Sequence, residues 1–127
     1  MTNAPMMTYS QGTGVFRGDD WMATGYSGNG AGLNNPEMQQ VKDVGPIPQG
    51  RYTIEPPHAD PVVGPVAMRL QPAAANEMFG RGDFLIHGDN TKLDHSASEG
   101  CIVLSYDARV EIGAEVLLGN NQLTVTA

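Results

Sequence analysis

Two side chains in this sequence have the chemistry of a nucleophile and a base. Cys101 is the only cysteine of the chain, and His87 lies fourteen residues before it, at the end of the apolar run 84–87. A lone thiol cannot form a disulfide within the chain, so it either packs as a small hydrophobic side chain or reacts. The small turn Ser98-Glu99-Gly100 leads into the thiol and then into a second apolar run. This arrangement favours a reactive cysteine, with thiol and imidazole at the ends of two neighbouring strands.

The other histidines and the glycine-rich segment carry weaker indications. His58 is interpreted as a surface loop residue, and His95, in the polar segment 90–97, as a lid residue that contacts substrate. All three histidines precede the cysteine, which argues against papain-like and NlpC-type peptidases. No ligand pair has the spacing of a zinc finger or of H-E-x-x-H, so the sequence predicts neither a metal nor a cofactor. The tract Gly28–Gly32 lacks a phosphate-binding pattern and is predicted to be a loop.

The composition is that of one globular domain over residues 1–127. The hydrophobic content of 40% and the charged content of 17% are those of a chain with a packed core. The net charge of −7 argues against binding to nucleic acid or to anionic membranes. No apolar run reaches transmembrane length, and the first residues lack a secretory signal. We therefore expect synthesis in the cytoplasm without a signal peptide, and no membrane insertion.

Glycine and proline divide the sequence into short segments, which suits strands and turns better than long helices. Ser105 is expected to cap a helix that runs to about Ile112 and ends at Gly113. The segment 27–49 is predicted to be a long functional loop, or one that covers a groove. The fold class is mainly β, a β-sandwich or partly open barrel with one or two short helices. The expected strands are 6–10, 15–17, 21–26, 51–54, 66–70, 84–87 and 101–104, followed by a closing hairpin of 115–118 and 122–125.

Three segments resemble a known enzyme family. Ile-His-Gly at 86–88, followed by Ser-Glu-Gly-Cys-Ile at 98–102, resembles the L,D-transpeptidase (YkuD-like) signature, in which I-H-G precedes S/T-H-G-C-I. The segment 45–52 is similar to the T-P-x-G-x-F/Y start of a strand in that family. The Ser-x-Gly-Cys form and the tract 25–30 resemble a narrower group, the L,D-transpeptidase-like effectors that type VI secretion delivers into rival bacteria. The resemblance implies an L,D-transpeptidase-like catalytic domain.

The resemblance also assigns roles to individual residues. Cys101 would be the nucleophile and His87 the base, and the Gly88 carbonyl or the Asp89 side chain would orient the imidazole. Ser98 would brace the turn, and backbone N–H groups near Gly100 could line an oxyanion hole. The candidate clamps for substrate carboxylates are Arg51, Arg69 and Arg81, left unranked.

Two positions depart from the family pattern. Glu99 stands where the family has a histidine, and Val103 stands where it often has Arg or Asn. The family's preferences for the acyl-donor and acyl-acceptor stems therefore do not transfer directly to this chain. An acid beside a thiolate raises the pKa of the thiol unless it points away, and the sequence leaves its direction open.

The expected function is peptidoglycan modification by a cysteine enzyme. It would act on tetrapeptide stems as an L,D-carboxypeptidase, an L,D-transpeptidase with D-amino acid exchange, or both. The family resemblance implies an antibacterial effector toxin, active in the target-cell periplasm, with a secretion apparatus and a cognate immunity protein as partners. One alternative is a non-catalytic cell-wall-binding or phage structural module with a degenerate site. A sortase-like enzyme that uses Arg109 is a remote third, because the T-L-x-T-C sequence is absent.

Overall fold

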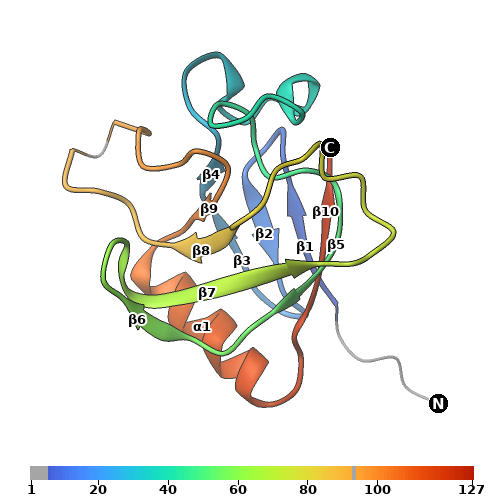
Figure 1. The fold of residues 1–127 in the computed structure, drawn as a ribbon. Helices are drawn as coiled ribbons and strands as arrows, with labels where there is room; N and C mark the ends of the chain where they lie inside the picture. Colours follow the sequence, from blue (N-terminus) through green and yellow to red (C-terminus); the bar gives the residue numbers. More distant parts are fainter. Residues whose placement is uncertain (1–5, 93) are drawn as a thin grey trace.

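The structure is a computed structural model that describes residues 6–92 and 94–127 (Figure 1). It is mainly β, with a single α-helix among the described residues, as the sequence predicts. The elements in chain order are β1 (Met7–Ser10), β2 (Val15–Arg17), β3 (Met22–Thr24), β4 (Tyr26–Ser27), the 3₁₀ turns η1 (Gly30–Gly32) and η2 (Pro36–Met38), β5 (Gly50–Ile54), β6 (His58–Asp60), β7 (Gly64–Pro72), β8 (Leu85–His87), β9 (Ile102–Val103), α1 (Tyr106–Leu117) and β10 (Gln122–Thr126).

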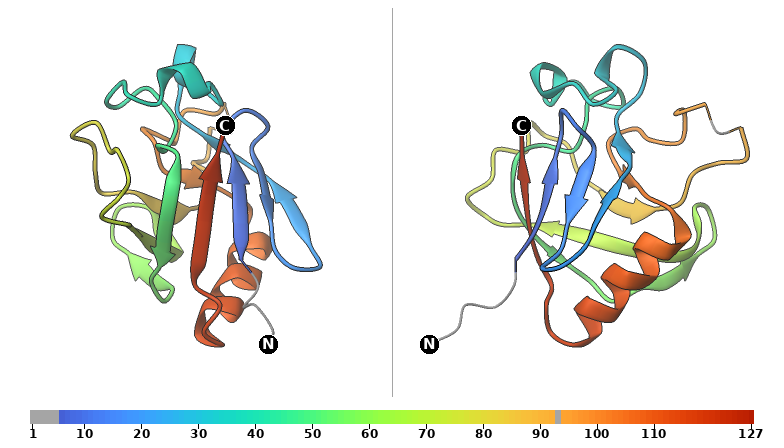
Figure 2. Two further views of the ribbon diagram at one scale, coloured as in Figure 1. Left: turned by 90° about the vertical axis from the view of Figure 1, so that its right-hand side faces the viewer. Right: turned by 180° about the vertical axis from the view of Figure 1, so that it is seen from behind.

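The sheet curls into a nearly closed barrel. Its strand order is β3-β2-β1-β10-β5-β7-β8-β9-β4, with β6 added beside β7. The two outermost strands, β3 and β4, are separated in the chain only by Gly25, so the two ends of the sheet must lie together (Figure 2). A Cβ at Gly25 would lie 1.9 Å from the carbonyl oxygen of Val103 on β9. Only glycine allows the chain to cross between the two ends at this point.

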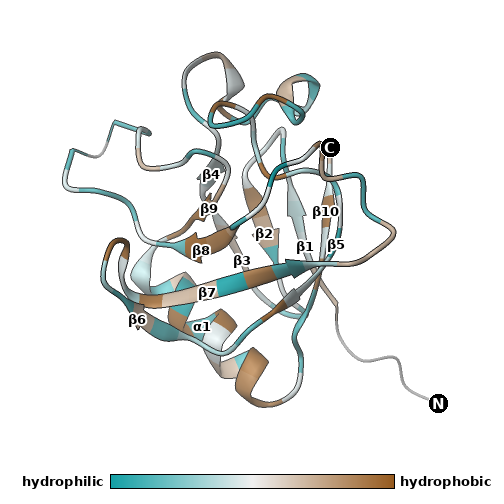
Figure 3. Ribbon diagram, in the orientation of Figure 1, coloured by the Kyte–Doolittle hydropathy of each residue, from teal (hydrophilic) through white to brown (hydrophobic). Residues whose placement is uncertain are grey.

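The helix α1 covers one opening of the barrel and packs against β7 (Figure 2). Ser105 caps it as expected, because its Oγ accepts a hydrogen bond from the Ala108 N–H at 3.2 Å. Ile112 and Val116, four residues apart, are buried in the core that the strands form. Figure 3 shows hydrophobic residues in brown along these strands and the helix, and β8 is among the most hydrophobic strands.

Two predictions for the C-terminal segment were wrong. Gly113 does not end the helix but lies inside it, where its ideal Cβ position is 3.1 Å from Pro57 Cγ. The residues 115–118, expected as a strand, form the last turn of the helix and its cap because Val116 is buried against the core. β10 therefore has no hairpin partner at 115–118 and instead pairs in parallel with β1 and antiparallel with β5.

The region before β7 also differs from the expectation. His58 belongs to β6, which pairs with β7 although prolines flank it on both sides. The segment 21–26 is two short strands broken at Gly25, and the segment 27–49 contains two 3₁₀ turns. Within the described residues, no helix has both the length and the hydrophobicity needed to cross a membrane.

Candidate active site

The pairing of β8 with β9 brings the predicted base and nucleophile to one face of the sheet. The two strands are parallel, with Ile86 opposite Ile102 and His87 opposite Val103. Ile86 and Ile102 point into the core. Cys101 directly precedes β9. Since side chains alternate along an extended chain, His87 and Cys101 share the opposite face as diagonal neighbours, with Cα atoms about 7–8 Å apart. An imidazole and a thiol can meet across such a diagonal with a change of side-chain rotamer.

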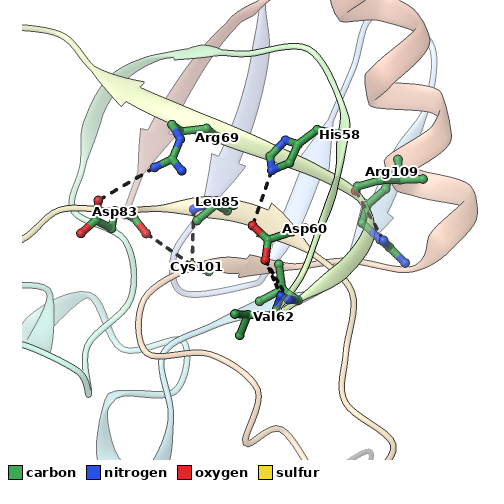
Figure 4. A network of polar contacts seen from close by, with 10 residues as sticks. His58, Asp60, Val62, Arg69, Asp83, Leu85, Cys101 and Arg109 are labelled. Atoms are coloured by element: carbon green, nitrogen blue, oxygen red, sulfur yellow. Dashed lines mark hydrogen bonds and ion pairs between the residues drawn. The ribbon is translucent and has the colours of Figure 1, made fainter.

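Cys101 is held by the backbone of β8 and of the residues before it. Its Sγ accepts a hydrogen bond from the Leu85 N–H at 3.3 Å and lies 3.9 Å from the Asp83 carbonyl oxygen (Figure 4). These are the only hydrogen bonds of the sulfur among the described residues, so the thiol is not bonded to His87 in this state. Burial is the main cause that raises the pKa of the Cys101 thiol, and the Leu85 N–H opposes it. The resting group is the neutral thiol.

His87 has the tautomer that a general base requires. Its Nδ1 lies 2.7 Å from the carbonyl oxygen of Gly88. Because a carbonyl can only accept, Nδ1 must carry the hydrogen, and Nε2 is left with its lone pair. Burial lowers the pKa of His87, so the imidazole stays neutral near pH 7. The Asp89 carboxylate does not contact the ring but accepts a hydrogen bond from the Tyr26 hydroxyl at 2.7 Å.

The turn before the thiol is fixed by two buried serines. Ser98 Oγ accepts from the N–H groups of Gly28 and Gly100 at 2.9 and 3.0 Å and donates to the Cys101 carbonyl at 2.6 Å. Ser27 Oγ donates to the Gly100 carbonyl at 2.8 Å. The Gly100 N–H is thus used inside the turn. In this state it shapes the nucleophile's position and is not free to bind an oxyanion.

Gly100 needs to be glycine, and Gly88 packs closely against an arginine. Gly100 has φ of +133°, and a Cβ there would lie 2.6 Å from Arg81 Nη2 and from the Phe84 ring. A Cβ at Gly88 would lie 2.7 Å from Arg109 Nη2. The glycines of the two sequence motifs therefore reflect close packing of arginines behind the site.

The thiol opens into a charged pocket of about 370 Å³. His87 lines a second hollow of about 210 Å³, with Val62 and Val63 from the β6–β7 turn and with Asp89. The two catalytic candidates thus border two spaces that share no lining residue. The residues that line the thiol's pocket are Lys42, Asp43, Gly80, Arg81, Gly82, Asp83, Phe84, Glu99 and Cys101.

The four substrate-binding candidates occupy different environments. Arg81 is buried, and its guanidinium donates to backbone carbonyls of the 39–46 segment and of Glu99. Arg51 is exposed on β5 and lines neither space. His95 packs edge-on against Tyr26, with ring centroids 4.9 Å apart, and lines a separate pocket. Arg69 is partly exposed and does not line the thiol's pocket, but its Nη1 lies 3.9 Å from a carboxylate oxygen of Asp83, which does (Figure 4).

Arg109, considered above for a sortase-like role, has a structural environment. Its Nε donates to the carbonyl oxygen of Leu104 at 3.1 Å, and its Nη1 donates to that of Pro65 at 2.5 Å. These bonds join the start of α1 to the start of β7. The guanidinium is therefore occupied with backbone groups in this state.

Glu99 acts on the thiol through its charge. The carboxylates of Glu99 and Asp83 both raise the pKa of Cys101, while the Arg81 guanidinium lowers it. Both residues line the thiol's pocket. Glu99 therefore lies close enough to Cys101 for its charge to raise the pKa of the thiol.

Replacing Glu99 with glutamine is expected to speed alkylation of Cys101 by iodoacetamide about threefold at pH 8, because loss of the negative charge lowers the thiol pKa and raises the thiolate fraction. The rate is measured by mass spectrometry of the intact protein. Glu111→Gln, which removes an exposed charge on α1, is the matched control and should leave the rate unchanged. Equal rates for wild type and Glu99→Gln would contradict this account of the charge.

Sequence reasoning missed Ser27 and gave Arg81 a different role. Ser27, on β4 beside β9, donates to the Gly100 carbonyl in the turn before the thiol, and its Oγ accepts a hydrogen bond from the Ile47 N–H at 2.9 Å. Arg81 ties the 39–46 segment to the turn before the thiol. The only indication in the sequence that Ser27 supports the site was its position as a polar residue between Tyr26 and a glycine.

Comparison with known proteins places the chain in a family. A search among curated proteins found no match. Within the described residues, no group of three or more His, Cys, Asp or Glu side chains could hold a metal ion. The family model of the Tlde1 domain matches residues 22–127, a span that includes β4, β8, β9 and the thiol. The chain therefore belongs to the Tlde1 domain family, whose members are L,D-transpeptidase-like domains of type VI secretion effectors.

Proposed function

We propose that this effector domain is a cysteine acyl-transferase that acts on the peptide stems of peptidoglycan. The observation that carries the proposal is the shared face of β8 and β9, where a thiol lies diagonally from an imidazole whose Nδ1 is held by the Gly88 carbonyl. This leaves Nε2 as the base. The family membership adds a delivery route into rival cells, which fits a target in the periplasm and a protective immunity partner in the producer.

Proton transfer would accompany the attack on the substrate. Since burial raises the thiol pKa and lowers the imidazole pKa, the resting pair is neutral. His87 Nε2 takes the thiol proton as Cys101 Sγ forms a bond with the carbonyl carbon of the diaminopimelate residue. The tetrahedral intermediate then loses D-alanine, whose amine receives that proton from the imidazolium. A thioester on Cys101 remains.

The second half of the reaction releases the acyl group. Water, or the amine of a D-amino acid or of a second stem, attacks the thioester carbon while His87 accepts the proton of the attacking group. The C–S bond breaks, and the imidazolium returns a proton to the sulfur. Hydrolysis gives a tripeptide stem, and transfer gives an exchanged or cross-linked stem. Protonation of His87 removes the base, so activity should fall as the pH drops below the ordinary imidazole range.

The proposal is tested by incubating the protein with purified tetrapeptide muropeptides and measuring their masses. Loss of one alanine is expected without an added amine, and exchange is expected when a D-amino acid is supplied. Because Cys101 is the only cysteine, protein alkylated with iodoacetamide is a control modified at that thiol, and it should leave the masses unchanged. Unchanged masses with folded, unmodified protein would contradict the proposal.

One observation favours a second function, that of a non-catalytic cell-wall-binding module. Cys101 and His87 border different spaces, and the thiol has no hydrogen bond to the imidazole among the described residues. Catalytic hydrogen bonds often tighten only when substrate binds, so this state is also compatible with an enzyme. Binding of muropeptides without any change in their masses would favour the module.

A further inference from the structure

The position of Arg69 relates it directly to the nucleophile. Arg69 lies opposite Leu85 in the pairing of β7 with β8, and the Leu85 N–H donates to Cys101 Sγ. Opposite residues of paired strands project from the same face of a sheet. The Leu85 hydrogen bond brings Cys101, which directly precedes β9, next to Leu85, so the arginine begins about 10 Å from the Cα of Cys101, two strand spacings away. A guanidinium at the end of a flexible side chain can cover that distance.

The other cations are less suited to bind a substrate at the thiol. The guanidinium groups of Arg81 and Arg109 are occupied by backbone carbonyls. Neither Arg51 nor Arg69 lines the pocket, but Arg69 pairs with the lining residue Asp83, whereas Arg51 lies on β5 with no such link among the described residues. Lys42 lines the pocket from the opposite loop, but an ammonium is a point charge without the planar fork that matches a carboxylate. Arg69 has the geometry for a bidentate contact and projects from a paired strand.

The present partner of Arg69 holds it weakly. The Arg69–Asp83 ion pair has one contact of 3.9 Å, and the side chains are 42% and 98% exposed. Exposed ion pairs of this kind contribute little stability, so a better-placed carboxylate can displace Asp83. Among the described residues, this ion pair is the only polar contact of the Arg69 guanidinium. The remaining donors of its fork are therefore available to a ligand.

The charge of the pocket creates a need for such a contact. Three acidic residues line the space in front of the thiol, Asp43, Asp83 and Glu99, against Lys42 and the occupied Arg81. An anionic substrate would be repelled there unless another cation turned toward it. A tetrapeptide stem carries carboxylates at its terminal D-alanine and on its diaminopimelate side chain. Val103 stands where the related enzymes often have an Arg or Asn, so the sequence offers no cation at that position.

We infer that Arg69 binds a carboxylate of the acyl donor, and that Asp83 holds the guanidinium beside the thiol until the substrate carboxylate replaces it. For the natural substrate this inference rests on the proposed function. Asp83 then has two effects in the free protein, which are to occupy Arg69 and to add negative charge near Cys101. Both effects weaken when the substrate carboxylate binds Arg69 and the exposed Asp83 side chain turns away from it.

The inference can be tested without the natural substrate by a pair of alkylating reagents. Iodoacetate and iodoacetamide form the same S–C bond with Cys101 and expel iodide, but only iodoacetate carries a carboxylate. The measured quantity is the ratio of their alkylation rates, which cancels changes in the thiol itself. Arg69→Gln should lower the ratio about fivefold at low salt, with a smaller effect at high salt, because a charge-assisted contact is lost and salt screens it.

Three further variants make this test specific. Arg51→Gln removes the same charge outside the pocket and should leave the ratio within about twofold of wild type. Asp83→Asn frees Arg69 and should raise the ratio. Lys42→Gln removes the exposed cation that lines the pocket itself. A ratio that falls for Lys42→Gln and not for Arg69→Gln would overturn the inference.

Muropeptides separate this inference from the proposed function. If wild type releases D-alanine, Arg69→Gln should raise KM about tenfold with little change in kcat, as expected for loss of a charged hydrogen bond in the bound state. Amidation of the terminal carboxylate or of the diaminopimelate carboxylate identifies the group that Arg69 binds, since KM for that substrate should no longer respond to the variant. Activity with an unchanged KM and alkylation ratio would refute the role of Arg69 alone. A lowered ratio without muropeptide turnover would refute the proposed function alone.

Discussion

Replacing Cys101 with serine is expected to reduce D-alanine release from tetrapeptide stems by about 10⁴-fold or more, to the limit of detection. A serine hydroxyl loses its proton far less readily than a thiol, and the neutral imidazole of His87 lacks the basicity to compensate. The Leu85 N–H that contacts the sulfur would also contact the smaller oxygen less well. The rate is measured by mass spectrometry of muropeptides at equal protein concentration.

The serine variant is nearly isosteric, so its fold provides the control. Its thermal midpoint should lie close to that of wild type because the turn before it is fixed by Ser98 and Ser27 through backbone groups. Retention of activity within tenfold of wild type would show that the thiol is not the nucleophile. If the serine variant loses both activity and folding, Cys101→Ala should be measured in its place, because alanine has no side-chain polar atom that must bond to the Leu85 N–H.

Replacing Arg81 with methionine is expected to lower the free energy of unfolding by about 3–5 kcal/mol, the largest stability effect that we predict. The Arg81 side chain is only 8% exposed. Its guanidinium donates to the carbonyls of Gln39, Pro46, Gly45 and Glu99 at 2.5, 2.8, 3.0 and 3.1 Å. Methionine retains the apolar stem but leaves these buried acceptors without donors, and bonds to a charged donor are the stronger kind.

Urea denaturation followed by circular dichroism measures this effect. Arg51→Met removes the same charge and length from an exposed position and should change stability by less than about 1 kcal/mol. Arg81→Met should also expose Cys101, because the guanidinium joins the 39–46 segment to the turn before the thiol. A loss below 1 kcal/mol for Arg81→Met would mean that the segment is held by its other contacts, such as the Ile47 N–H bond to Ser27 Oγ.

The parts of the fold that depend on local chemistry were predictable from the sequence. The β1–β2 hairpin follows from a glycine-containing turn between apolar runs, and the helix start follows from Ser105 at the cap position. The helix end was not predictable, because Gly113 lies inside the helix against Pro57 and the buried Val116 continues it. The position of β10 between β1 and β5 depends on residues far away in the sequence.

The candidate site likewise has a part that the sequence predicts and a part that it does not. The spacing of His87 and Cys101 indicated two strand ends, and the structure places His87 at the end of β8 and Cys101 directly before its partner strand β9. The supports of the site are tertiary, since Ser27 and Arg81 reach the turn from segments far along the chain. No local pattern distinguishes a surface arginine from one that organises a loop. Likewise, the sequence alone does not distinguish Arg69 from Arg51. Only the strand register shows that Arg69 lies opposite Leu85, whose N–H contacts the thiol.

The placement of β10 has a consequence for how the domain is made. Residues near the two ends of the described chain, in β1 and β10, are neighbours in the middle of the sheet. Contacts of such large sequence separation raise the contact order, which slows folding because a long loop must close first. A growing chain that has not reached Gln122 leaves the edges of β1 and β5 unpaired. Completion of the domain therefore waits for its last strand, although the thiol and the imidazole are translated earlier.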